Sequence, residues 1–439
     1  MRILLFILAV LCLWGCVKGN KQVANEDTEG SVRILSQLDY PLTIHLKDAL
    51  THNYEDIFLS TFVDSIEYIP LKLKNNFMRG NISFLFFDEH AQKIILSDFV
   101  NIVVTDRNGE FLTKIGREGQ GPAEYVQIGH VSIDVKKQQV YVYDGQTRYI
   151  KRYDYNGTFL GNVFRNNAKY ASSVNFYNDS CYITQGGGGF SGIPESILKE
   201  FFGYALIDTL SNFYDNSRTV NLSQLVKQDG SRYSAYVYGF GMAFSANRVL
   251  LNEAGLSDTI YTISDNTIIP RYLFDYGDEK PDITKLYSGD QDIRFYEQEN
   301  YIFIMDPVYE TSRYVFTRFS KKGKKYILLH DKVKGKTFSV SNDKDPNARK
   351  QDDLSAKIGL YNDIDGGIDL YPKSISTQGS YWVVVYNATD FKELIEQKRK
   401  SNPDKIKDSL VKLAETINDE DDHIVILMKL KDEMKEEVL

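Results

Sequence analysis

The sequence predicts an all-β protein of the β-propeller class, and three observations carry that prediction. The motif Asp-x-Asn-Gly-x-Phe-Leu occurs twice, beginning at Asp106 and at Asp154, 48 residues apart, and a period of this size is typical of stacked or radial repeats. Short runs of alternating β-branched and aromatic residues recur between turn residues, as in half-buried strands. The Asn-Gly pairs at Asn108 and Asn156 stand between such runs and predict type I′ hairpin turns.

The individual strands are expected where these runs occur. Clear examples are residues 93–98, 139–144, 301–306 and 380–386. The chain holds 30 Tyr and 25 Phe, both of which favour strands. Lys322-Gly323 is expected to be a weaker copy of the Asn-Gly turn. Repeated antiparallel units suggest a propeller; an open sandwich is the alternative, but it does not explain the internal copies. Polar insertions are expected at residues 280–300 and 332–353.

The C-terminal part departs from this pattern. Residues 388–415 have the apolar spacing of helices, and Pro403 is expected to divide them into two. The strand-like run 423–430 follows. We therefore expect a small helical insertion at about 388–415 and then a last strand that closes the ring, with the first and last segments in one blade.

The N-terminal residues predict a targeting segment. Arg2 precedes an apolar run, residues 3–13, that is too short to span a bilayer as a helix. The run ends in Leu-Trp-Gly-Cys16, which resembles the lipobox of bacterial lipoproteins and implies cleavage before Cys16 and a lipid on its thiol. A plain secretory signal is the alternative. We expect a signal peptide at 1–15, a flexible tether at 16–40 and the propeller at 41–439. Cys181 is then the one other cysteine of the mature chain, which excludes an internal disulfide.

Five segments in order resemble the six-bladed β-propeller lipoproteins of Bacteroidetes, which are NHL-like. These segments are residues 67–71, residues 116–125, the three runs 257–261, 270–272 and 274–277 of one mid-chain blade, residues 362–372 and residues 421–426. The resemblance implies six blades and a lipid-anchored protein of the bacterial cell envelope. It implies the outer membrane but does not decide between the periplasmic face and the cell surface.

The densest motif is GREGQGPAEY at residues 116–125. Its glycines could expose backbone N–H groups that bind an anion, and the positive charge of Arg117 would favour the same anion. The alternative is a turn between two blades in which glycines adopt special backbone conformations and Glu124 caps or pairs nearby. A phosphate loop is excluded because no Gly-Lys-Ser/Thr follows. Arg117, Glu124 and Tyr125 are the candidate residues of this loop.

A second motif is the acidic cluster around Asp363 and Asp365, with Asp369 and two glycines. Oxygen ligands at alternate positions could hold a structural calcium ion, but the full calcium loop is absent. A turn with satisfied carboxylates is the other interpretation. The six histidines form no zinc motif, so we expect no cofactor and no bound metal other than this calcium alternative.

The net charge of −8 and the pI near 5.5 argue against a nucleic-acid partner, because phosphate binding requires a basic face. We expect a membrane contact through the lipid and a non-catalytic binding or scaffold function. The ligand is unknown; a glycan, a peptide or an outer-membrane uptake system is a candidate partner. The alternative is a hydrolase or lyase acting on glycans or peptides at the central funnel. It would require ionisable side chains with shifted pKa values in one central pocket, and the catalytic residues are unknown.

Overall fold

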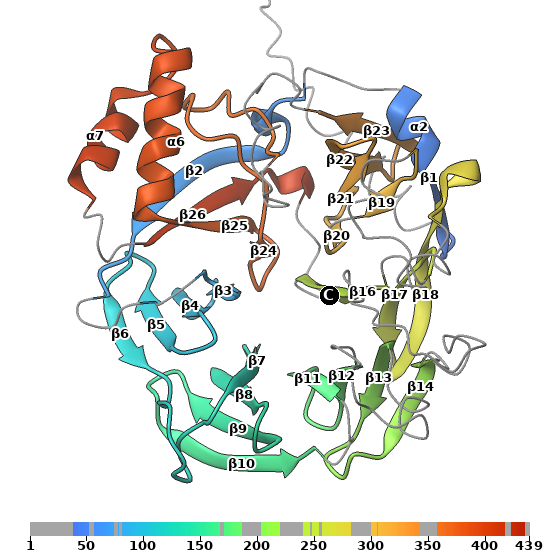
Figure 1. Cartoon of the computed structure of the whole chain (residues 1–439), viewed down its shortest axis with the longest axis vertical. Coiled ribbons are helices and arrows are strands. Elements are labelled where there is room, and N and C mark those ends of the chain that lie inside the picture. The colour runs from blue at the N-terminus through green and yellow to red at the C-terminus, as the bar shows by residue number, and fades with distance from the viewer. Residues whose placement is uncertain are drawn as a thin grey trace, which may run out of the picture. The chain divides into compact units, whose positions relative to one another are not determined.

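A computed structural model describes residues 38–51, 57–73, 78, 81–166, 171–186, 203–219, 240–245, 248–253, 257–281, 300–304, 306–341, 358–417 and 423–434. Residues 39–439 form one compact unit. Six sheets of four or five strands stand around a central axis in this unit (Figure 1). The fold is therefore a six-bladed β-propeller, which confirms the predicted fold class.

The blades follow one another in sequence order, with the innermost strand first. The first blade holds β3 (Phe84–Asp88), β4 (Lys93–Ser97), β5 (Ile102–Asp106) and β6 (Phe111–Lys114), and the second holds β7 (Ile128–Asp134), β8 (Gln139–Asp144), β9 (Tyr149–Asp154) and β10 (Phe159–Arg165). The third holds β11 (Ala171–Phe176), β12 (Tyr182–Gly186), β13 (Gly203–Ile207) and β14 (Phe213–Thr219), and the fourth holds β15 (Phe240–Ser245), β16 (Arg248–Glu253), β17 (Thr259–Ser264) and β18 (Thr267–Asp275). The fifth holds β19 (Phe303–Ile304), β20 (Tyr309–Glu310), β21 (Tyr314–Lys321), β22 (Lys324–Asp331) and β23 (Lys336–Val340), and the sixth holds β24 (Ser374–Ile375), β25 (Tyr381–Asn387), β26 (His423–Leu430) and β2 (Val63–Pro70).

The sixth blade closes the ring. Its three inner strands come from the C-terminal part of the chain, whereas its outermost strand, β2, comes from the N-terminal part. β2 pairs antiparallel with β26 along its length, from Val63 opposite Leu430 to Pro70 opposite Ile424. The expected closure by the first and last segments is confirmed. Figure 1 shows the blue β2 beside the red β26.

The repeated turn differs from the type I′ turn that Asn-Gly predicts. In the pair Asn108-Gly109 only Gly109 has a positive φ, of 82°, whereas a type I′ turn requires two. The Asp106 carboxylate accepts hydrogen bonds from the backbone N–H groups of Asn108 and Glu110, at 2.8 and 2.9 Å. This side chain favours a three-residue loop with a left-handed glycine. Asp154 makes the same two bonds in the second blade.

The third blade holds a copy of this turn that the sequence analysis missed. Asp208 accepts from the N–H groups of Leu210 and Asn212, both at 2.8 Å. Ser211 occupies the place of the glycine, with a φ of 66°. By contrast, Lys322-Gly323 has two positive φ values and joins β21 to β22, the second and third strands of its blade. It is a hairpin turn as expected, but it is not a copy of the repeated one, which joins a third strand to a fourth.

The glycine of the repeated turn also lets neighbouring blades approach closely. A Cβ on Gly109 would lie 2.3 Å from the backbone oxygen of Pro70, in the closing strand. A Cβ on Gly157 would lie 2.7 Å from the backbone oxygen of Lys114, in the outer strand of the first blade. At both positions the motif therefore needs glycine for its backbone conformation and for its packing against the preceding blade.

A strand from the N-terminal segment extends the fourth blade. β1 (Leu42–His45) pairs parallel with the outermost strand β18, with Leu42 opposite Tyr272 and His45 opposite Asp275. The short helix α2 (Leu46–Thr51) follows and buries Leu46 and Ala49. The Ser339 hydroxyl of the fifth blade donates to the Ala49 carbonyl at 2.6 Å.

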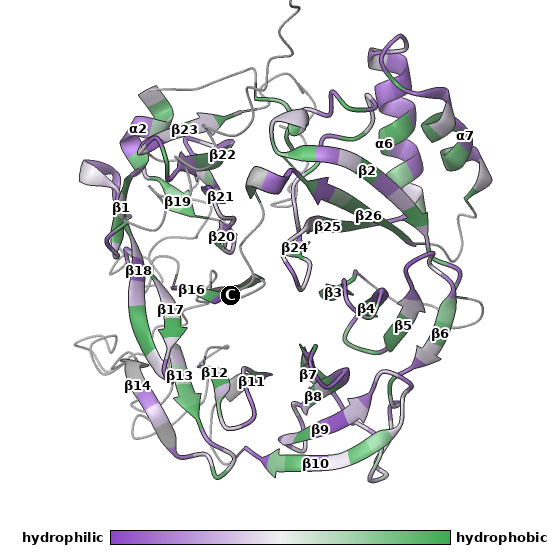
Figure 2. Cartoon of the chain, turned by 180° about the vertical axis from the view of Figure 1, so that it is seen from behind, coloured by the Kyte–Doolittle hydropathy of each residue, from purple (hydrophilic) through white to green (hydrophobic). Residues whose placement is uncertain are grey.

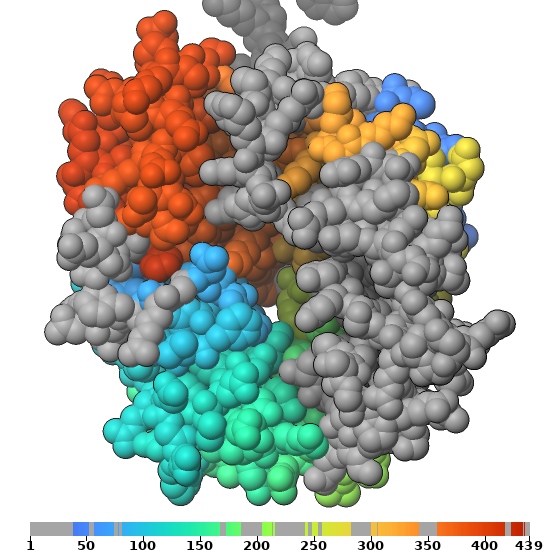
Figure 3. Space-filling view, viewed as in Figure 1, coloured from blue at the N-terminus to red at the C-terminus, as the bar shows by residue number. Residues whose placement is uncertain are grey.

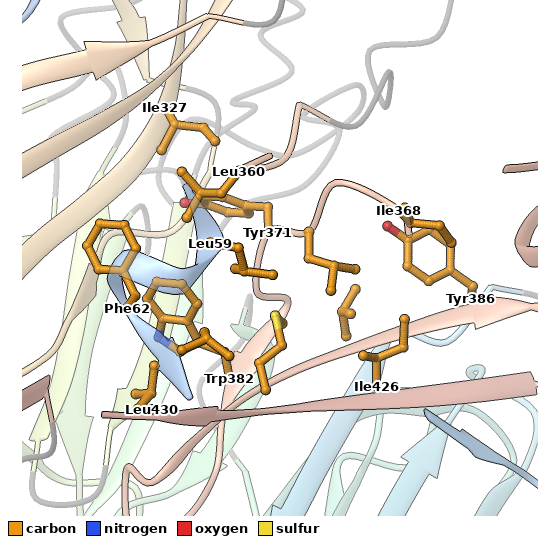
Figure 4. Close-up of a cluster of buried hydrophobic side chains, with 14 of the residues drawn as sticks. Leu59, Phe62, Ile327, Leu360, Ile368, Tyr371, Trp382, Tyr386, Ile426 and Leu430 are labelled. Atoms are coloured by element: carbon orange, nitrogen blue, oxygen red, sulfur yellow. The ribbon is translucent and has the colours of Figure 1, made fainter. Parts of the chain in front are cut away.

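The helical insertion lies between β25 and β26, as expected. α6 (Ala388–Ser401) begins at Asn387, whose side chain accepts from the Asp390 N–H, and α7 (Asp408–Thr416) follows. Figure 2 shows α6 as mostly hydrophilic. Its buried side chains, which include Phe391 and Ile395, join the largest core cluster, which also contains Phe62 and Trp382 (Figure 4). No helix among the described residues is long and apolar enough to cross a membrane.

One expected insertion is wrong in part. Residues 332–353 look polar throughout, yet β23 lies within them as the outermost strand of the fifth blade. Lys336 and Phe338 alternate with the buried Thr337 and Ser339. The strand looks polar because two of its buried positions carry hydroxyl groups. The Ser339 hydroxyl can be buried because it donates a hydrogen bond to the Ala49 carbonyl of α2.

Candidate functional site

The described residues surround a central cavity of about 540 Å³. Its walls include side chains from all six blades, mainly from the innermost strands: Phe84 on β3, His130 on β7, Gln185 on β12, Met242 on β15, Tyr309 on β20 and Ile375 on β24. The face of the ring in Figure 3 is recessed near its centre. The volume lies in the range of small-molecule sites, so the propeller axis is the candidate site.

One half of the cavity wall is apolar and aromatic. Blades one, two and four contribute Phe84, Phe86, Met242 and Phe244, together with His130. The His130 ring stands edge-on to the Phe84 ring, with centroids 4.5 Å apart. Burial lowers the pKa of His130 to about 3, so its imidazole is neutral at neutral pH. None of these five side chains is therefore charged at neutral pH.

The other half of the wall carries an ion pair that arises from a break in a strand. The inner strand of the fifth blade is divided into β19 and β20, and Asp306-Pro307 lies between them. Proline has no N–H to give to a β-ladder, which favours such a break. The Thr317 hydroxyl bonds to the backbone oxygens of Asp306 and Pro307, at 3.2 and 3.3 Å. Arg318, the next residue of β21, then meets the Asp306 carboxylate.

Two contacts fix the guanidinium of Arg318. Its Nη2 donates to Asp306 Oδ1 at 3.0 Å, and its Nε donates to Asp306 Oδ2. Its centre lies 4.6 Å from the centroid of the Tyr371 ring, within cation–π range. Burial would lower the pKa of Arg318, but the hydrogen bonds and charge of Asp306 outweigh it and raise that pKa. The arginine is therefore charged and held in one orientation at the cavity wall.

Lys373 and Asp369 are the other charged side chains of this wall. The Lys373 ammonium donates to the Ile82 carbonyl. Asp369 accepts from Lys398 of α6 at 2.7 Å. Both carboxylates of the wall, Asp306 and Asp369, are thus held in ion pairs. Neither carboxylate of the described wall is therefore unpaired.

A second charged cluster lies between the fourth and fifth blades and outside the cavity wall. Glu310 of β20 is 2% exposed and binds Arg271 at 2.7 Å, Lys332 at 2.8 Å and Arg248 at 3.2 Å. Burial alone would raise the pKa of Glu310, but these three cations outweigh it and hold the pKa well below its usual range. We call these four residues the Glu310 cluster. It joins β16 and β18 of one blade to the next blade.

The structure places Arg117, Glu124 and Tyr125 in the connection from β6 to β7, away from the cavity wall. Arg117 Nε donates to Glu124 Oε1 at 2.6 Å, and the Gly121 N–H donates to Glu124 Oε2 at 2.8 Å. The hydrogen bond from Gly121, followed by that from Arg117, lowers the pKa of Glu124. Tyr125 is buried, and its hydroxyl donates to the Val100 carbonyl at 3.2 Å. These contacts lie within the protein and favour the inter-blade turn over the anion site.

The acidic cluster has the contacts of a turn. The Asp365 carboxylate accepts from the Asn362 side chain at 2.7 Å, from the Gly367 N–H at 2.9 Å and from the Tyr68 hydroxyl at 2.9 Å. Asp363 accepts from the Ser60 N–H at 3.0 Å and from the Ser60 hydroxyl. Protein donors therefore occupy both carboxylates. In the described part of the chain no three His, Cys, Asp or Glu side chains are grouped as metal ligands.

Other candidates of the sequence analysis lie outside the described residues. These are Cys16 with the signal peptide, nearly all of the tether, residues 282–299 of the first expected insertion and residues 342–353 of the second. Cys181 is described and buried. Burial raises its pKa to about 12, so the thiol is protonated and unreactive at neutral pH.

The residues of the cavity wall were not identified from the sequence. His130 was one of six scattered histidines, and Asp306 was the end of an expected strand. One local signal was present in the run YVFTRFS at 314–320. Arg318 is the one charged residue of that run, and a charge within a strand of aromatic and β-branched residues is costly unless it is paired or exposed to a cavity.

Comparisons with known proteins agree with the fold. A family model described as "Domain of unknown function (DUF4934)" matches residues 41–429. A "putative exported protein" of Bacteroides fragilis is 19% identical, with a TM-score of 0.62, over 89% of this chain and 99% of that one. A member of the duf4221 family from Bacteroides vulgatus is 12% identical, with a TM-score of 0.47, over 86% of this chain and 99% of that one. No curated protein sequence matches.

Proposed function

This chain belongs to the family DUF4934, whose description assigns no activity. From the cavity and the N-terminal sequence we propose that the protein is an exported, lipid-anchored module. It binds a small ligand or a peptide end on the propeller axis. The observation that carries this proposal is the cavity of about 540 Å³ with walls from all six blades. Its opposite halves differ in polarity, and a few placed polar groups within an apolar wall are the usual composition of a ligand site.

The proposed location rests on the N-terminal sequence. The lipobox-like Leu-Trp-Gly-Cys16 supports lipidation in the cell envelope, and the resemblance to Bacteroidetes lipoproteins supports the outer membrane. The similar Bacteroides fragilis protein, described as exported, is consistent with this location. An outer-membrane uptake system that receives the ligand is the partner that best fits such a place, by analogy of context.

A hydrolase or lyase is less well supported. His130 has a shifted pKa and lies in the cavity wall, but both carboxylates of the wall are in ion pairs. A retaining or inverting glycosidase needs two carboxyl groups that flank the bond to be cleaved. Turnover of a glycan or peptide by the purified protein, lost in Asp306→Asn, would overturn the non-catalytic proposal.

Ligand binding is tested by thermal unfolding of residues 17–439 with libraries of glycans, peptides and small organic acids. A ligand at one hundred times its Kd should stabilise the fold by about 2.7 kcal/mol. Ala243→Trp, which fills the cavity from β15, should abolish the shift while the unliganded protein still unfolds cooperatively. A shift that is unchanged in Ala243→Trp would place binding elsewhere and refute the cavity as the site.

Lipid anchoring is tested by fractionating cells that express the full chain. Cys16→Ala should release the protein from membranes, and Cys181→Ala is the matched control that should leave it bound. Protease treatment of intact cells then separates the cell surface from the periplasmic face. Continued tight membrane association of Cys16→Ala would refute lipidation.

A further inference from the structure

We infer that the cavity ligand is an amphipathic monocarboxylate, with its carboxylate on Arg318 and its apolar body against the opposite wall. This inference rests on the proposed function, since it names the ligand class of the same site. Three features of the cavity carry it: where the charged side chains lie, which donors of Arg318 are used, and what faces them across the axis.

The charged side chains of the wall lie on one side of the cavity. Asp306 and Arg318 belong to the fifth blade, and Asp369 and Lys373 lie in the segment that leads into the sixth. Lys398 adds its charge through Asp369. Asp306 and Asp369 are each paired with a cation, Arg318 and Lys398 respectively. The charged end of a ligand is therefore expected on this side, with the Arg318 guanidinium as the group that meets an anion.

Arg318 has donors left for that charge. A guanidinium carries five N–H groups, and Asp306 engages one on Nε and one on Nη2. Among the described residues no group bonds to Nη1, and the side chain is 25% exposed. The Nη1 and Nη2 hydrogens that remain form the end of the guanidinium fork, which matches the two oxygens of a carboxylate.

The guanidinium is also positioned before a ligand arrives. Asp306 holds one edge of its plane, and the Tyr371 ring covers one face. Tyr371 is in turn packed edge-on against Phe316, with ring centroids 6.1 Å apart. A donor pair that is already oriented loses little conformational entropy on binding. Arg318 therefore has the properties of an anchor for an anion.

Among the described residues, the wall across the axis carries no charged side chain. The fifth blade stands opposite the second in a ring of six, so the neutral His130 and its Phe84 neighbour face the charged side. Met242 and Phe244 extend this apolar wall on the fourth blade. Methionine adapts to irregular apolar shapes, and aromatic faces bury large areas. The body of the ligand is therefore apolar or aromatic.

The test is calorimetric titration with decanoate and 4-phenylbutyrate, each compared with its uncharged primary amide. Wild-type protein should bind at least one acid ten-fold or more tightly than its amide. Arg318→Met should lose that preference, and Asp306→Asn should strengthen acid binding because it adds a net positive charge. Arg313→Met is the matched control: Arg313 is also paired with a carboxylate, Asp331, in the same blade, but it does not line the cavity. It should bind as wild type does.

Failure of this inference is distinct from failure of the proposed function. Equal binding of acids and amides, or binding of glycans or peptides alone that is lost in Ala243→Trp, would overturn the carboxylate and keep the cavity as a binding site. Acid preference that survives in a folded Arg318→Met would overturn the role of Arg318. If no ligand of any of these sets binds, the proposed function and this inference both fall.

Discussion

Two acidic side chains in one short segment, Asp306 and Glu310, have opposite surroundings. Glu310 is buried and meets three cations from two blades, and Lys332 also donates to the Thr311 carbonyl at 2.8 Å. Asp306 is 19% exposed and meets one arginine at the cavity wall. The first arrangement joins the blades. The second leaves N–H donors of Arg318 unused in the cavity wall. The comparison therefore separates charges that build the ring from a charge that can bind a ligand.

Glu310→Gln should have the largest effect on stability. It leaves Arg271, Lys332 and Arg248 close together without their shared anion, and breaking a buried ion pair in this way costs about 3–5 kcal/mol. Urea unfolding followed by tryptophan fluorescence measures the loss. Ligand binding by the folded fraction should be unchanged. A loss below about 1 kcal/mol would show that the Glu310 cluster does not hold the two blades together.

Asp306→Asn should destabilise the fold by less, about 1–2 kcal/mol. The amide oxygen keeps one hydrogen bond to Arg318, and the partly exposed guanidinium is still solvated from the cavity, so the cost is that of a weakened charged hydrogen bond. The same unfolding experiment measures it. A loss as large as that of Glu310→Gln would remove the distinction between the two carboxylates.

The pH dependence of stability should distinguish His130, in the cavity wall, from His330, in β22 outside that wall. Burial lowers the pKa of His130 to about 3 and that of His330 to about 4, below the unfolded value near 6.5. Each histidine therefore stabilises the fold above pH 6.5, and this contribution is lost as the pH falls. The slope approaches about 1.4 kcal/mol per pH unit for each group.

Unfolding free energies at pH 7.0 to 5.0 check this prediction. His130→Gln in the cavity wall and His330→Gln in β22 should each flatten the profile. Ligand affinity should change only in His130→Gln, because His330 does not line the cavity. A profile that His130→Gln leaves as steep as before would mean that water in the cavity lets the wild-type imidazole charge freely.

The fold could be predicted because its signals are local and repeated. The motif at Asp106 and Asp154 gave the period, and alternating runs gave the strands. The blade count followed from the resemblance. The turn type was wrong because the Asp106 side chain, bonded to Asn108 and Glu110, selects a different loop from the one that Asn-Gly favours. The third copy, at Asp208, was missed because Leu-Ser replaces Asn-Gly.

The candidate site could not be predicted in the same way. Its wall combines residues from six blades, and no local pattern tells which alternate residues of an inner strand face the axis. The glycine-rich loop at 116–125 attracted attention because it is dense in motif residues. Its hydrogen bonds from Arg117 and Gly121 to Glu124 are internal. Arg318 was visible in the sequence as the one charge of the run 314–320, but its partner, Asp306, could not be assigned without the fold.

The parallel pairing of β1 with β18 has a mechanical consequence. A protein attached to a membrane through its N-terminus is pulled through the residues that precede Leu42. That force reaches the four paired residues of β1, from Leu42 opposite Tyr272 to His45 opposite Asp275, before it reaches β2 and the seam with β26. Under the proposed anchoring through Cys16, tension on the N-terminal segment would therefore detach the short strand β1 from the fourth blade before it loaded the seam between β2 and β26 that closes the ring.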